Sequence, residues 1–319
     1  MPPLTHRPAT LEDARLAADL ITSYFPDEPV DPALERYWWA NPNPEDFVER
    51  FVAERDGHPV AVVSWYHGPW AKMPRRYGAV RAVVPPALRS SPVLGRLFSF
   101  IEGRAVEGGT EVLISRARED DAARQRFLRR AGYRQERLGK NWELDLESNR
   151  LQLMEMVRAS RERMASEEVS LLTLAEDRDP ERYRQLYELT NEGEADIPTT
   201  VPIVPPPFEN FMKWFSQPGL LDDRFWIARQ GDQPVGISVL CYPPERGNVW
   251  TEWTTVARAA RGRGIARALK LETLAQAIDL GVRSVRTQND GENAPILHLN
   301  EQMGYRRIPG MLEFHRPLS

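Results

Sequence analysis

Cysteine is almost absent from this chain, which contains a single one, Cys241, in 319 residues. This count excludes an internal disulfide framework and a cysteine-rich metal site. Long apolar runs are also missing, since no stretch approaches the roughly 20 apolar residues that a membrane-spanning helix needs. Residues 1–7 lack the apolar core of a signal peptide. We therefore expect a soluble, cytoplasmic protein that has neither a metal site nor a membrane partner.

Lysine is scarce as well, with 4 Lys against 38 Arg. Arginine forms fixed forks with carboxylates and phosphates, but a GC-rich genome produces the same bias, and we attribute most of the bias to that cause. The totals are 42 basic and 46 acidic residues, a net charge of −4. Such a balance does not indicate a strongly basic surface, and we expect no nucleic-acid partner.

The chain repeats itself at a nearly constant offset. Three pairs of segments match in the same order: 50–61 with 224–236, 84–89 with 256–261, and 131–134 with 303–306. Two of the offsets are 172 residues and the third is about 174. Such internal similarity indicates a duplicated unit. We expect domains at 1–147 and 168–319, joined by a helix over 148–167 that contains neither Gly nor Pro.

Hydrophobic periodicity predicts an α/β fold, with a mixed sheet and covering helices in each half. The predicted strands are 3–9, 49–55, 59–67, 77–84, 111–116, 133–146, 168–174, 224–229, 234–242, 248–256, 282–288 and 304–316. The predicted helices are 11–24, 44–50, 91–107, 120–131, 180–191, 207–216, 263–280 and 293–303.

The segment 254–270 carries the clearest functional signal. A predicted strand leads into Gly262 and Gly264, and a helix follows at once. Glycine lets the backbone adopt unusual dihedrals and lets a ligand approach closely. The first amides of a helix form an anion site, and Arg258, Arg261 and Arg263 add positive charge. A pyrophosphate fits such a turn, although a glycine-rich turn can also serve only as a connection.

Arg261-x-x-Gly264-x-Ala266 resembles the acyl-CoA pyrophosphate loop of the GNAT superfamily of N-acetyltransferases. The segment 289–305 resembles the second signature of that family, a strand end followed by a short helix. The resemblance covers about 168–317. It implies two tandem GNAT-like domains, an architecture similar to mycothiol synthase, with acetyl-CoA as cosubstrate. The implied CoA-binding residues are Thr255, Val256, Arg258, Arg261, Gly262, Arg263, Gly264, Ile265, Ala266, Asn293 and Asn300.

The first half resembles the same family with a defective loop. Its loop reads Arg89-Ser90-Ser91-Pro92-Val93-Leu94. Pro92 stands where the family has Gly, and Leu94 where it has Gly or Ala. Proline has no N–H to offer a phosphate. We therefore expect the first half to bind acetyl-CoA poorly or not at all, or to hold another ligand in its cleft.

Family chemistry implies direct attack of an amine on the thioester, so Cys241 is not needed as a nucleophile and is interpreted as a buried, inert thiol. Glu252 is the predicted general base, because it is the only ionisable residue in 248–256. We expect it to share one strand face with Trp250, Thr254 and Val256, and its neighbouring tryptophans to raise its pKa. It can equally be a solvent-facing Glu or bind a substrate ammonium. The implied strand contacts to pantetheine require this strand to splay from its neighbour.

The general acid is not identified. Many family members have a Tyr where this chain has Asn300, which cannot donate a titrating proton; His298 and Tyr305 are more often structural. Three acidic residues in 191–198 favour a small cationic amine as acceptor, although a solvated acidic loop explains them equally well. The prediction is an acetyl-CoA-dependent N-acetyltransferase, monomeric or homodimeric, and the alternative is a non-catalytic acyl-CoA-binding or scaffolding protein.

Overall fold

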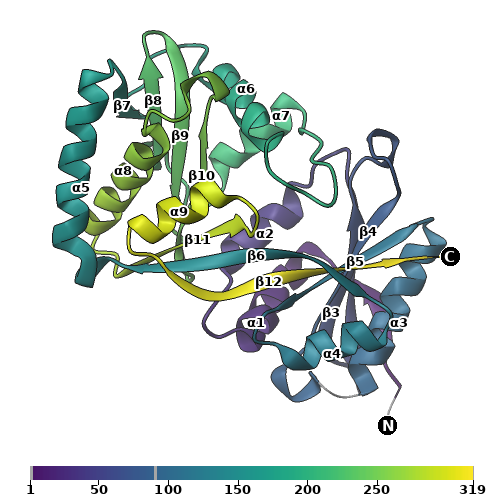
Figure 1. The fold of residues 1–319 in the computed structure, drawn as a ribbon. Helices are drawn as coiled ribbons and strands as arrows, with labels where there is room; N and C mark the ends of the chain where they lie inside the picture. The colour runs from purple at the N-terminus through teal and green to yellow at the C-terminus, as the bar shows by residue number, and fades with distance from the viewer. Residues whose placement is uncertain (1–2, 90–91, 319) are drawn as a thin grey trace.

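A computed structural model describes residues 3–89 and 92–318 (Figure 1). In these residues twelve strands form one mixed sheet in the order β1-β2-β3-β4-β5-β12-β6-β11-β10-β9-β8-β7. The strands of the first half are β1 (Thr5–Pro8), β2 (Phe47–Arg55), β3 (His58–His67), β4 (Tyr77–Val83), β5 (Val112–Arg118) and β6 (Arg134–Asp145). Those of the second half are β7 (Ser170–Thr173), β8 (Phe225–Gln230), β9 (Gln233–Cys241), β10 (Val249–Val256), β11 (Ser284–Asp290) and β12 (Arg306–Pro317).

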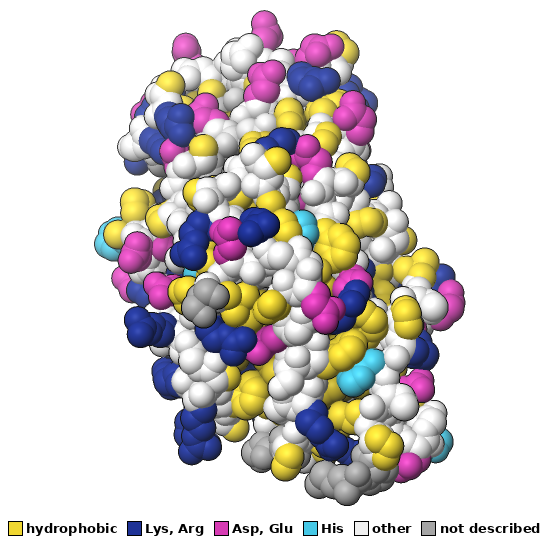
Figure 2. Space-filling model, turned by 90° about the vertical axis from the view of Figure 1, so that its right-hand side faces the viewer, with side chains coloured by type: hydrophobic (Ala, Val, Ile, Leu, Met, Phe, Trp, Pro, Cys, Tyr) yellow, Lys and Arg dark blue, Asp and Glu magenta, His cyan; other side chains and the backbone are white. Residues whose placement is uncertain are grey.

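Helices cover both faces of the sheet. They are α1 (Ala14–Tyr24), α2 (Pro32–Ala40), α3 (Pro92–Glu107), α4 (Ala122–Arg130), α5 (Leu146–Ser166), α6 (Arg182–Glu194), α7 (Phe208–Phe211), α8 (Ile265–Asp279) and α9 (Ala294–Gln302). The hydrophobic cores place α1 and α2 on the same face as α6 and α7, and α3, α4, α5, α8 and α9 on the other. On the side that Figure 2 shows, acidic and basic side chains are intermixed over most of the surface.

The duplication is visible in the element boundaries. The pairs β5 and β11, α4 and α9, and β6 and β12 have the same lengths and begin 172 residues apart, at 112 and 284, 122 and 294, and 134 and 306. The internal repeat inferred from the sequence is therefore confirmed by the structure.

The two halves exchange their last strands, which corrects the expectation of a separate sheet in each half. β12 pairs with β5 of the first half, whereas β6 pairs with β11 of the second. β6 and β12 also pair with each other in the middle of the sheet, and Figure 1 shows them crossing the molecule side by side. Both strands have twelve residues and antiparallel neighbours, so their local pattern does not tell which half each one completes.

Two further expectations about the first half need correction. The helix expected at 44–50 is absent, because residues from Phe47 onward pair with β3 as strand β2. Helix α2 was not predicted from the sequence. It begins after Asp31, whose carboxylate accepts hydrogen bonds from the backbone amides of Ala33 and Leu34. This is a standard N-cap arrangement, with Pro32 at the first helical position.

The segment between the halves forms α5, as expected for a connecting helix. It packs closely against α8, through Leu153 and Val157 in the core shared with Leu271. Arg161 of α5 also forms a bidentate ion pair with Glu272 of α8, at 2.7 Å for both contacts. The helix is thus part of the second half's packing and does not act as a free tether.

Candidate active site

Strands β10 and β11 separate soon after they meet. Their parallel pairing is limited to Val249 with Val285 and Trp250 with Arg286. β11 nevertheless stays paired with β6 as far as Asp290. The expected splay is therefore present, and it opens into a cavity of about 1410 Å³. In the splayed part, the two strands are not paired with each other, which leaves room for an extended ligand between them. Two carbonyls of β10 already accept side-chain hydrogen bonds there, Thr251 from Thr287 and Val256 from Arg261, both at 3.1 Å.

The glycine-containing turn lies at one end of this cavity. Gly262 and Gly264 have φ of 78° and 88°, in the left-handed region that glycine adopts without strain. A Cβ on Gly264 would lie 3.3 Å from the Arg163 guanidinium. Helix α8 starts at Ile265, so its first amides have no intrahelical partner and carry the positive end of the helix dipole. The turn therefore has the geometry of an anion site.

Most of the predicted cosubstrate residues line the cavity. These are Thr255, Val256, Arg261, Gly262, Gly264, Ile265, Ala266 and Asn293. The Arg263 side chain instead bonds to Glu167 and Gln230, at 3.0 and 2.8 Å, so it does not add charge to the turn. Asn293 precedes α9 without capping it through its side chain, which leaves that amide available to the cavity.

Acidic side chains from the end of α6 sit against the turn. Asp196 forms ion pairs with Arg258 and Arg261, at 2.6 and 2.5 Å, and the two guanidiniums hold the pKa of Asp196 well below its usual range. The carboxylate of Glu192 accepts the backbone amide of Arg258. Two carboxylates of the acidic segment 191–198, which was expected to attract a cationic acceptor, are therefore bound to the turn. The backbone amide of Arg258, which was expected to contact pantetheine, already donates to Glu192.

Glu252 lies in a β-bulge. The pairing with β9 shifts between Thr251 and Trp253, so the alternation predicted for this strand is broken. Trp250 and Trp253 pair with Cys241 and Val239 and pack into one core with α6 and α7. Thr254 and Val256, however, point to the opposite face. The expectation that all these residues share a face with Glu252 is wrong, because a bulge reverses the phase of a strand.

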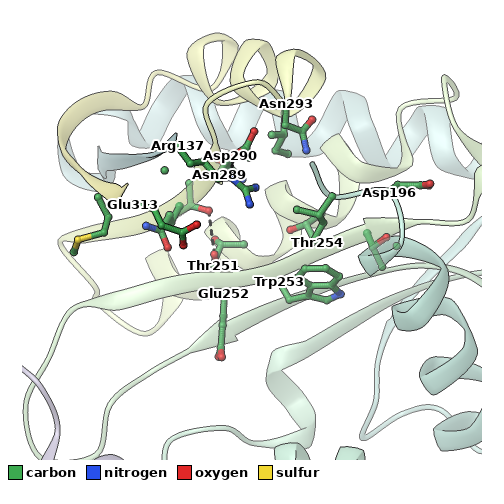
Figure 3. Close-up of a pocket in the computed structure, with 18 of the residues that line it drawn as sticks. Arg137, Asp196, Thr251, Glu252, Trp253, Thr254, Asn289, Asp290, Asn293 and Glu313 are labelled. Carbon is green, nitrogen blue, oxygen red and sulfur yellow. Dashed lines mark hydrogen bonds and ion pairs between the residues drawn. The ribbon is translucent and has the colours of Figure 1, made fainter. Parts of the chain in front are cut away.

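The Glu252 side chain points away from Thr251 and its neighbours (Figure 3). Its carboxylate accepts a hydrogen bond from Gln217 at 3.3 Å. The side chain is exposed to the cavity. The partial burial of its carboxyl group raises its pKa, whereas hydrogen bonding with Gln217, Cys241 and Trp214 acts in the opposite direction. The rise expected from the sequence is confirmed, although these neighbours were not foreseen. A carboxylate with a raised pKa suits a general base near neutral pH.

The remaining candidates are buried or peripheral. Asn300 is fully buried and donates to Asn289 at 2.6 Å. His298 is exposed on α9 and contacts Gln302. Cys241 is buried, and burial raises the pKa of its thiol to about 12, which fits the predicted inert thiol. Lys270, which also lines the cavity, was not identified from the sequence because a single lysine in a predicted helix looks like an exposed position.

The cavity continues into the first half, where β4 and β5 also separate after Ala79 and Ile114. There the space is occupied by side chains. Arg124, 7% exposed, donates to the carbonyl of Ala82 at 2.7 Å. Tyr24 donates to Asp121 across the same gap. Of the defective loop, Ser90 and Ser91 lie outside the described residues, whereas Pro92 begins α3.

The described residues contain no cluster of three or more His, Cys, Asp or Glu side chains suited to hold a metal ion. Within the same residues, none of the helices is long and apolar enough to cross a bilayer.

Comparison with known proteins agrees with this geometry. Residues 183–305 match the model of the Acetyltransferase (GNAT) family. The chain is 31% identical over 150 residues to a Bacillus subtilis protein named "Putative phosphinothricin acetyltransferase YwnH", an alignment that covers 44% of this chain and 89% of the relative.

Solved structures match over the whole length. A tandem GNAT protein from the clavulanic acid biosynthesis pathway superposes with a TM-score of 0.77 at 15% identity, covering 99% of this chain and 98% of the other. A GCN5-related N-acetyltransferase from Sphaerobacter thermophilus gives 0.67 at 19% identity, covering 99% and 97%. These two likenesses show the tandem fold. With the family match and the sequence relative, they identify the chain as a member of the GNAT family of N-acetyltransferases, whose cosubstrate is acetyl-CoA.

Proposed function

We propose that this chain transfers the acetyl group of acetyl-CoA directly to the primary amine of a small cationic acceptor, with Glu252 as general base. The proposal places the cosubstrate in the second half, residues 168–319, and treats residues 1–147 as a repeat that has lost its phosphate turn. The observation that carries it is the splay of β10 and β11, which has the anion-binding turn at one end and Glu252 beside it.

Charge in the cavity supports an ammonium-bearing acceptor. Three carboxylates of the second half that line the cavity have arginine partners: Asp196 with Arg258 and Arg261, Asp290 with Arg137, and Glu313 with Arg116. Glu252 lines the same cavity, and it accepts a hydrogen bond from the neutral amide of Gln217. It is therefore the carboxylate best placed to bind an ammonium group and then remove its proton.

In this proposal, one group of residues binds the cosubstrate and another residue acts on the amine. The turn amides and Arg261 would hold the pyrophosphate. Thr255 and Val256 of β10 would bind the pantetheine amides once Arg261, which donates to the Val256 carbonyl at 3.1 Å, turns to the phosphates. Bound acetyl-CoA supplies the thioester that the amine attacks. Glu252 orients the amine and accepts its proton, which keeps the nitrogen lone pair available. Cys241, with its raised pKa, takes no part.

The first half is proposed to bind no acetyl-CoA. By the 172-residue offset, Ala82 corresponds to Thr254 on the splayed strand of the second half. Its carbonyl accepts from the Arg124 side chain, which occupies part of the gap between β4 and β5 where a pantetheine arm would lie. The first half also lacks the glycine pair of the turn.

A titration with acetyl-CoA followed by an assay against a panel of primary amines tests the proposal. We expect one equivalent of acetyl-CoA to bind per chain, and Glu252→Gln to lose turnover while it retains binding. Glu188→Gln, on the exposed side of α6, is the matched control and should behave as the parent. Binding of two equivalents would contradict the assignment of the first half. Binding without turnover on any amine would favour a non-catalytic acyl-CoA-binding protein.

A further inference from the structure

Lys270 is a buried lysine in the wall of the active-site cavity. Its side chain is 1% exposed and lies on α8, facing the splay between β10 and β11. In the part of the chain that the structure describes, its Nζ makes neither a hydrogen bond nor an ion pair, and its contact is the face of the Tyr305 ring, 5.2 Å away. A lysine is almost never fully buried without a partner, so its position points to a ligand.

Other polar groups around Tyr305 also lack partners. The hydroxyls of Thr251 and Tyr305 and the amide oxygen of Asn300 are buried without a hydrogen bond of ordinary geometry. Asn300 reaches Asn289 of β11 through its amide nitrogen. Buried polar atoms in native proteins nearly always have a partner. Their concentration here, together with Lys270, marks a polar chamber built to receive the reacting end of a substrate.

The chamber lies where that end must be. Helix α8 rises about 1.5 Å per residue, so Lys270 lies about 9 Å inward from Gly264 of the phosphate turn. A cosubstrate held at the turn and threaded between β10 and β11 would bring its thioester past this point. Glu252 is on the opposite face of β10, towards α6 and α7. The cavity thus offers a base on one face and an amine on the other.

Burial lowers the pKa of Lys270 to about 7. The titratable group that faces it is the phenol of Tyr305, whose own pKa burial raises. On α5, which packs against α8, Arg161 is engaged with Glu272 on the far side of the helix. His298 and Arg267 also line the cavity, and neither contributes to the pKa shift of Lys270. Lys270 therefore exchanges a proton near neutral pH without a neighbouring charge that would fix its state.

We propose that Lys270 is a catalytic residue, the acid that protonates the sulfur of CoA as it leaves. This inference rests on the proposed function and fills the role for which Asn300 has no proton. The acceptor ammonium first loses one proton to solvent through Glu252. The neutral amine then bonds to the thioester carbon and gives a second proton to Glu252. The C–S bond breaks with its electron pair on sulfur, which takes a proton from the Lys270 ammonium. Solvent then returns the proton from Glu252 to Lys270, so neither residue is changed overall.

The test compares Lys270→Met and Lys270→Arg with Leu271→Met, a control on the same helix that is buried away from the cavity. Two acetyl donors are used with the best amine of the panel: acetyl-CoA, and p-nitrophenyl acetate, whose phenolate leaves without needing a proton. With acetyl-CoA, Lys270→Met should lower kcat by about 10² or more and abolish the fall in rate above pH 7. With p-nitrophenyl acetate it should change the rate less than threefold.

A folded Lys270→Met variant with undiminished kcat, or with equal losses for both donors, overturns the role. A second measurement does not depend on the acceptor. The ultraviolet absorbance of thiolate in bound CoA reports the charge on the sulfur. At pH 7, where about half of Lys270 is an ammonium, the parent should hold several times more thiolate than Lys270→Met. Equal thiolate fractions in the two proteins refute the inference even if no amine is acetylated; a larger fraction in the parent without any turnover refutes only the proposed function.

Discussion

Replacing Lys270 with methionine should stabilise the protein near neutral pH. An exposed lysine in the unfolded chain has a pKa of about 10.4, whereas burial lowers the pKa of Lys270 to about 7 in the folded protein. The unfolded state therefore binds more protons than the folded state between these two values. Stability then rises with pH across this window and is lowest below pH 7. Methionine has a similar length and no proton to lose.

The size of the effect follows from the difference between the two pKa values. At about 1.4 kcal/mol per unit, the full shift corresponds to roughly 5 kcal/mol. At pH 7 the lysine is half protonated in the folded state, and the penalty is about 4 kcal/mol; by pH 10 it has fallen to about 1 kcal/mol. The parent should thus gain about 3 kcal/mol relative to Lys270→Met between pH 7 and pH 10.

Urea unfolding of both proteins at pH 6, 7, 8, 9 and 10 measures this difference, because other titrating groups contribute equally to both and cancel. Leu271→Met, which alters the same helix without adding or removing a titrating group, should give a curve parallel to that of the parent. A free-energy difference between the parent and Lys270→Met that stays constant within about 0.5 kcal/mol over this range would refute the assignment of Lys270 as a buried, titrating amine.

Three other substitutions probe the site. Glu252→Gln should lower the amine acetylation rate by about 10² or more. It should also remove the increase of this rate with pH on the acidic limb of the steady-state pH profile; an unchanged profile excludes the base role. Gly264→Ala should weaken acetyl-CoA binding at least tenfold by calorimetry, because φ of 88° strains alanine and its Cβ meets Arg163 at 3.3 Å; unchanged affinity argues against binding at the turn. Asp196→Asn should tighten acetyl-CoA binding several-fold at low salt by releasing Arg258 and Arg261; equal or weaker binding shows that Asp196 does not compete with the phosphates.

The duplication and most elements could be predicted because they depend on local patterns that occur twice. The strand expected at 77–84 is observed at Tyr77–Val83, and the one expected at 248–256 at Val249–Val256. The helix expected at 44–50 failed because pairing with β3 extends β2 back to Phe47. The strand exchange could not be predicted from local sequence. β6 and β12 have equal lengths, and which strand each one pairs with depends on the packing of the whole sheet.

The features of the site also differ in whether local sequence predicts them. The turn before α8 was predictable because its backbone conformation depends on two glycines at a fixed spacing before a helix. Glu252 was predictable as the ionisable residue of its strand, but its orientation was not, because the bulge after Thr251 is a tertiary feature. Lys270 carries no motif: a single lysine between Leu269 and Leu271 looks like an exposed helical position until packing shows it buried.

The exchanged strands explain what the first half contributes to a cleft in the second. Beyond Arg286, β11 has no partner in β10, and an isolated strand edge would tend to close the gap or fray. β6 pairs with β11 along its full length to Asp290, where Arg137 of β6 forms an ion pair with Asp290. The first half thus holds one wall of the cleft open, and it can do so without a phosphate turn of its own. The strand β6 is therefore needed for the cleft of the second half whether or not the first half binds a ligand of its own.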